Sequence, residues 1–136
     1  MIDAIEQTEG STGTVTGPIR DETGAVVTAA KISSFKVTLA CIETEPSTIV
    51  NGRYEVDLYT GGWPNKDGMK ATIDANGDCT IRLAAADNVL LAGSTRGERH
   101  SLIVEIGTGT TPATNIRDSI EFFVKKIDKP AAPPAP

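Results

Sequence analysis

The chain has 136 residues, of which 39% are hydrophobic, 23% are charged and only 4% are aromatic. This length is enough for one domain with a core, which must be filled mainly by Val, Ile, Leu and Ala. The formal net charge of −5 excludes a uniformly basic surface, so phosphate-driven nucleic-acid binding is not expected. No stretch approaches the roughly 18 apolar residues of a membrane span. Residues 1–6 lack the basic and apolar regions of a signal peptide, so we expect synthesis in a cytoplasm and no membrane partner.

The first third of the chain moves from a polar segment into extended ones. Residues 1–13 are polar, acidic and without a clear period, which predicts an N-terminal arm. Residues 14–20 read as an edge-like strand, because Pro18 has no N–H to donate to a central ladder. Residues 34–42 form the clearest predicted strand, since alternate side chains are apolar. One face of that strand would carry Phe35, Val37, Leu39 and Cys41.

The remaining segments continue the same pattern of short strands and turns. Residues 69–73 and 78–83 read as a hairpin, and residues 98–106 and 116–127 as two further strands. Residues 84–91 are the one stretch that favours a short helical segment, with Gly93 as its stop. This pattern predicts an all-β domain over residues 14–127, a sandwich or a barrel. We expect its shared core to contain Phe35, Val37, Leu39, Ile81, Leu102, Val104, Ile120 and Phe122.

No group of residues in the sequence indicates catalysis, a cofactor or a metal. Cys41 and Cys79 fall on apolar phases and are expected as reduced core thiols, although a disulfide between them stays open. Two Cys and a single His at these spacings are too few soft ligands for a predicted metal site. His100, the only histidine, has no nucleophilic elbow to serve, so we expect it at the surface or in an interface.

One acidic turn imitates part of a calcium loop. Asp74, Asn76 and Asp78 match the first three ligand positions. The sixth position is then Cys79 instead of Gly, and the twelfth is Ala85 instead of Glu. The turn is therefore predicted to close a hairpin and not to bind an ion.

Two regions are candidate interfaces. Trp63 lies in a Gly-rich loop over residues 61–68, near Tyr59, where it can cap its own core or anchor a partner. Residues 128–136 form a Pro/Ala-rich C-terminal tail that cannot bury enough apolar surface to order itself. We expect this tail to lie extended along a neighbouring subunit. Its candidate contacts are Lys125, Lys126, Lys129, Pro130, Pro133 and Pro134.

The sequence also resembles a group of structural proteins from tailed-phage virions. The segments that carry the likeness are residues 21–24, 32–39, 49–53, 73–83, 86–88, 98–102 and 120–125. They are similar to the N-terminal domain of upper baseplate proteins of lactococcal-type phages. The likeness covers roughly residues 18–127; the loop over residues 61–68 and the Pro-rich tail fall outside it. It implies an immunoglobulin-like β-sandwich with no catalytic residues.

These observations lead to one expected function and one alternative. We expect a non-enzymatic structural component of a virion, at the capsid surface or the head–tail (neck) region. Its partners would be capsid, portal or tail proteins, met in many copies per particle, so that contacts add up by symmetry and avidity. The alternative is a carbohydrate- or host-binding module of a fibre or baseplate, which would use loop residues such as Trp63 and Tyr59.

Overall fold

The computed structural model describes residues 5–93, 96–109, 114–127, 130 and 132–134. Within them the chain consists mostly of strands, with two short 3₁₀ helices. No helix in this part of the chain is long and apolar enough to cross a membrane. In chain order, the elements are β1 (Ile5–Thr8), β2 (Gly13–Pro18), η1 (Ala29–Lys31), β3 (Ile32–Cys41), β4 (Thr48–Ile49), β5 (Val56–Asp57), β6 (Lys70–Ile73), β7 (Asp78–Leu83), η2 (Ala85–Asn88), β8 (Gly97–Thr108) and β9 (Thr114–Lys125).

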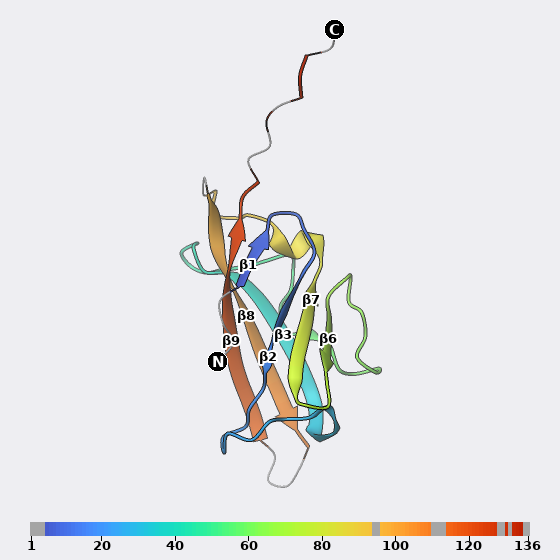
Figure 1. Ribbon diagram of the computed structural model, residues 1–136. Coiled ribbons are helices and arrows are strands. Elements are labelled where there is room, and N and C mark those ends of the chain that lie inside the picture. Colours follow the sequence, from blue (N-terminus) through green and yellow to red (C-terminus); the bar gives the residue numbers. More distant parts are fainter. Residues whose placement is uncertain (1–4, 94–95, 110–113, 128–129, 131, 135–136) are drawn as a thin grey trace.

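The described strands form two sheets that face each other (Figure 1). The larger sheet has the order β1-β9-β8-β3, and both β4 and β5 pair with the far edge of β3. The smaller sheet has the order β2-β7-β6. Strand β8 is antiparallel to β9 on one side and to β3 on the other, along most of its length. Because both of its edges are paired, the backbone polar groups of β8 are satisfied inside the sheet.

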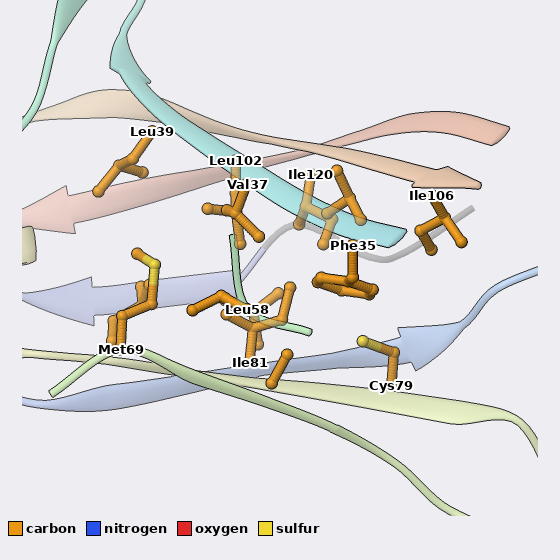
Figure 2. Packing of buried hydrophobic residues seen from close by; sticks show 14 of the residues in the cluster. Phe35, Val37, Leu39, Leu58, Met69, Cys79, Ile81, Leu102, Ile106 and Ile120 are labelled. Carbon is orange, nitrogen blue, oxygen red and sulfur yellow. The ribbon is translucent and has the colours of Figure 1, made fainter. Parts of the chain in front are cut away.

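The core lies between the two sheets and is aliphatic, with two phenylalanines. Figure 2 shows side chains of β3, β8 and β9 pointing toward Leu58, Met69 and the side chains of β7. The eight residues expected to share a core are all buried in one cluster, so that prediction is confirmed. The two-residue period of a strand places alternate side chains on one face, which is why the apolar pattern identified them. The all-β, two-sheet expectation is confirmed with it.

The expected N-terminal arm differs from the structure. Residues 5–8 form strand β1, which runs parallel to β9 at the edge of the larger sheet, with Thr8 opposite Lys125. The Gln7 side chain is buried and donates from Nε2 to the carbonyl of Thr14, 3.3 Å away. Because an inward-facing position of this strand is a polar glutamine hydrogen-bonded to the backbone, the segment shows no apolar alternation. The sequence pattern therefore missed the strand.

The short helical segment is present but smaller than predicted. Residues 84–91 were expected to be helical, whereas η2 spans only Ala85–Asn88. The Asp87 carboxylate accepts a hydrogen bond of 2.7 Å from the Ala84 N–H, which closes this turn. The polar side chains of Asp87 and Asn88 are both buried, so side-chain bonds inside the domain, and not an exposed helical face, hold the segment.

The predicted hairpin is confirmed as β6 and β7. Asp74 Oδ1 accepts hydrogen bonds from the backbone N–H of Asn76 and of Asp78, both 2.9 Å away, so this carboxylate organises the turn. Gly77 has a φ of +80°, and a Cβ there would overlap Val26. A side chain at this position would therefore be strained and would also clash with the neighbouring segment.

Packing between the sheets makes one stability prediction. Leu39 is fully buried opposite Leu102, whereas Leu91 keeps 40% of its surface exposed. Leu39→Ala should lower the free energy of unfolding by about 2–5 kcal/mol, because it leaves a cavity. Leu91→Ala, the matched control, should change it by less than about 1 kcal/mol. Urea denaturation followed by circular dichroism measures both, and equal losses would contradict the assigned core.

Candidate functional site

Three ionisable side chains meet in the interior at one end of the sandwich. Cys41 is the last residue of β3, and its register partner across the sheet is His100 of β8. Glu98 lies two residues before His100 on the same strand and therefore projects to the same face. All three residues are completely buried. Their sulfur, carboxylate oxygen and ring nitrogen atoms lie within 4.8 Å of one another. We call these residues the Cys-Glu-His cluster.

Glu98 is the centre of the cluster. Its Oε2 lies 2.7 Å from Nε2 of His100. The backbone N–H of Leu91 donates to both carboxylate oxygens, at 2.8 and 2.9 Å, and that of Ala92 donates to Oε1 at 2.8 Å. The Cys41 sulfur lies within 4.8 Å of a carboxylate oxygen. A buried carboxylate with so many donors connects the loop after η2 to both strands.

The surroundings shift the pKa values of Glu98 and Cys41 in opposite directions. Burial by itself would raise the pKa of Glu98, but the hydrogen bonds from Leu91, Ala92 and His100 outweigh it, and the net pKa is lowered. Burial raises the pKa of the Cys41 thiol, and the neighbouring Glu98 carboxylate raises it further. In the metal-free protein, the cluster at neutral pH therefore holds a carboxylate beside a protonated thiol.

The histidine ring is only partly engaged. It packs edge-on against Phe122, with ring centroids 5.7 Å apart. Its Nδ1 is buried and has no hydrogen-bond partner among the described residues. A buried polar nitrogen without a partner is uncommon, since most such atoms in proteins are paired.

The prediction that His100 lies at the surface or in an interface is wrong. Its side chain is fully buried, because it has the same parity on β8 as Leu102, Val104 and Ile106. Glu98 shares that parity. The sequence contained this signal, but two polar residues at the start of an apolar alternation are more often the exposed end of a strand.

A second buried polar group has a structural role. Arg53 Nε lies 2.7 Å from Asp87 Oδ1, and both side chains are nearly or fully buried. The guanidinium also donates to the carbonyls of Lys66 and Asp67, at 2.8 and 2.9 Å. Asn51 donates to the same carboxylate at 3.0 Å. This group joins the turn after β4, the loop before β6, and η2.

The aromatic residues of the expected interface pack mainly on their own domain. Trp63 is half-buried, with its ring edge-on to Phe35 and Tyr59 at centroid distances of 5.5 and 5.2 Å. Asp57 Oδ1 shapes this segment by accepting from the backbone N–H of Tyr59 and of Thr60, at 2.9 and 3.0 Å. The contacts favour the interpretation in which Trp63 caps its own core, while a role of the exposed remainder in binding stays a prediction.

The other expected interface residues lie at the end of β9 and after it. Lys125 ends β9, and both Lys125 and Lys126 are exposed. Pro130, Pro133 and Pro134 are exposed too. The C-terminal segment to which they belong extends away from the two sheets (Figure 1). Lys129 lies outside the described residues. The structure does not bring this group together with Trp63 and Tyr59 in any contact that it describes.

No protein-family model matches the sequence, and no curated protein matches it.

The donor types in the Cys-Glu-His cluster give it two possible kinds of chemistry. As hydrogen-bonding groups, they hold the loop after η2 against β3 and β8. As a thiol, a carboxylate and an imidazole within 4.8 Å, they are also the ligands that zinc-class ions prefer. No other described group of three His, Cys, Asp or Glu side chains has this proximity.

The two cysteines are separate and buried, as expected from the sequence. Burial raises the pKa of Cys79 to about 12 and also raises that of Cys41. Because the thiolate is the reactive form, neither residue should react with iodoacetamide in the folded, metal-free protein at pH 8. Mass spectrometry after non-reducing denaturation should find two alkylated thiols. A chain with none would show that a disulfide joins them.

The hydrogen bonds to Asp57 predict that the stability of the domain depends on pH in the acid range. Backbone and hydroxyl hydrogen bonds from Thr60, together with the Tyr59 N–H, lower the pKa of Asp57 from 3.8 to about 2. A lowered folded-state pKa contributes stability that is present above the unfolded-state value and is lost as pH falls through the folded-state value. The stability difference between wild type and Asp57→Asn should therefore shrink as pH falls from about 4 to 2. Urea denaturation followed by Trp63 fluorescence measures the free energy of unfolding of both proteins at each pH. Glu22→Gln controls for the loss of one negative charge. A stability difference that stays constant between about pH 4 and 2 would contradict the prediction.

Proposed function

We propose that this protein is a non-enzymatic structural component of a tailed-phage virion, at the capsid surface or the head–tail region, and that its sandwich is immunoglobulin-like. The C-terminal segment supports an assembly role most directly, because it continues from β9 away from the two sheets (Figure 1). The described residues of this segment after β9 are exposed and take no part in the core of the domain. It is available to a neighbour.

The connectivity supports the immunoglobulin-like part of the proposal. In immunoglobulin domains, strands C, F and G share one sheet, and strands B, E and D share the other. Here β3, β8 and β9 share the larger sheet, and β2, β7 and β6 share the smaller one in that order. The short β4 and β5 lie beside β3, on the side where variable-type domains add their extra strands, and β1 lies parallel to the last strand. This strand order supports the immunoglobulin-like part of the proposal.

The chemistry of the terminal segment suits docking on a neighbouring subunit. Lys125 and Lys126 are exposed where β9 ends, and Pro130, Pro133 and Pro134 follow. Proline restricts φ and removes backbone donors, so an extended Pro-rich segment loses little entropy when it lies along a surface. In a symmetric particle each copy repeats the contact, so a modest affinity per copy is sufficient.

The test is incorporation into particles. If the phage that encodes this chain is purified on a density gradient, the chain should band with the particles at a constant ratio to the major capsid protein. Removing residues 129–136 should reduce incorporation several-fold, because the docking contact is lost, without lowering the melting temperature of the free domain. Quantitative mass spectrometry of the banded particles measures the ratio to the major capsid protein for the intact chain and for the truncated chain.

Two outcomes would reject the proposal in different ways. A chain that stays in the soluble fraction of the lysate is not a virion component. A chain that bands with particles but binds host glycans, with quenching of Trp63 fluorescence, would favour the alternative of a carbohydrate- or host-binding module. Replacing Lys125 and Lys126 by alanine, with the tail intact, separates the cationic contribution from that of the proline segment.

A further inference from the structure

We propose that Cys41, Glu98 and His100 form a buried binding site for one zinc-class divalent metal ion. This inference does not depend on the proposed function, since it concerns the interior of the sandwich. It assigns ligand roles to residues that the sequence pattern did not group. The ion would connect the end of β3 to the start of β8.

The backbone already places the three ligands. Cys41 and His100 are direct register partners on paired antiparallel strands, and Glu98 is on the same face two residues earlier. The three ligand atoms lie within 4.8 Å of one another, so rotation of side chains is enough to converge on one ion. Because β8 is also paired with β9 on its other edge, binding needs no rearrangement of the sheet.

The distances within the cluster allow a metal ion to take the place of the hydrogen that His100 and Glu98 share. Zinc bonds of about 2.0–2.1 Å to nitrogen and oxygen and about 2.3 Å to sulfur place tetrahedral ligands roughly 3.3–3.6 Å apart. The contact between His100 Nε2 and Glu98 Oε2 is 2.7 Å. An ion in place of the shared hydrogen would move these two atoms apart by less than about 1 Å. Three protein ligands leave the fourth tetrahedral position to a water molecule.

The charges also balance in the interior. A divalent ion bound by a thiolate, a carboxylate and a neutral imidazole has no net charge, which suits completely buried residues. Binding releases the thiol proton of Cys41 to solvent. The imidazole contributes a lone pair and keeps one proton on its other nitrogen. The backbone N–H groups of Leu91 and Ala92 would remain on the carboxylate and orient it, as outer partners of metal ligands do.

The proximity of three different ligand types in the interior is the observation that favours a metal. When Nε2 of His100 binds the ion, Nδ1 carries the ring proton, and this atom has no partner among the described residues. Cys79, the other buried cysteine, belongs to no such group of ligands in the part of the chain that the structure describes, and it provides a matched control.

The experiment uses Co²⁺ as a spectroscopic probe on the full chain. Because the site is buried, the protein is unfolded in chelator and refolded with increasing Co²⁺. The proposal predicts a thiolate-to-cobalt absorption band that saturates at one ion per chain, is lost on adding Zn²⁺, and persists in Cys79→Ser. Cys41→Ser should remove the band and weaken Zn²⁺ binding at least about a hundredfold, since loss of even an outer partner costs 10–100-fold.

A second measurement begins with the wild type, whose result does not depend on the folding of any variant. Native mass spectrometry of wild type refolded with Zn²⁺ should show one added ion, and alkylation after unfolding should then give two thiols. His100→Gln, with its fold checked by circular dichroism, should lower the affinity while leaving Cys41 present. The proposal is overturned if refolded wild type gives no saturable band, if Cys41→Ser keeps the band, or if Cys79→Ser loses it.

Discussion

The pairing of β8 on both of its edges is the constraint on which the rest of this structure depends. Between β3 and β9, the strand cannot slip by one residue without turning its whole inner face to solvent. The register therefore buries Leu102, Val104 and Ile106 and, by the same parity, Glu98 and His100. One hydrogen-bond ladder thus determines both the apolar core and the polar cluster at its end.

Two buried carboxylates then hold the irregular parts of the chain on this framework. Glu98 binds the backbone of Leu91 and Ala92. Asp87 binds Arg53, which in turn reaches carbonyls in the loop before β6. With an aromatic content of only 4%, the domain has few large side chains with which to cover its loops. Charge-assisted hydrogen bonds supply that order instead, and removing one partner would leave a buried charge unsatisfied.

The position of the Cys-Glu-His cluster relates the two proposals spatially. Glu98 pairs with Val124, and the preceding Gly97 pairs with Lys125, the last residue of β9. The cluster therefore lies at the end of the sandwich from which the C-terminal segment leaves. An ion that connects β3 and β8 there would stiffen the base of that segment. The two proposals are nevertheless tested by different measurements, one on particles and one on the isolated chain.

The sequence by itself determined the all-β class, the face of each long strand that is buried and the hairpin at Asp74, because these depend on a local period of two and on local turn chemistry. Only the tertiary structure decided the rest. Strand β1 is stabilised by pairing with β9 and by the burial of Gln7, which no local pattern encodes. Cys41 and Glu98 lie far apart in sequence, and they meet because β3 and β8 pair in one particular register. A register between distant strands is set by the packing of the whole core, so the polar cluster could be found only once the sheets were assembled.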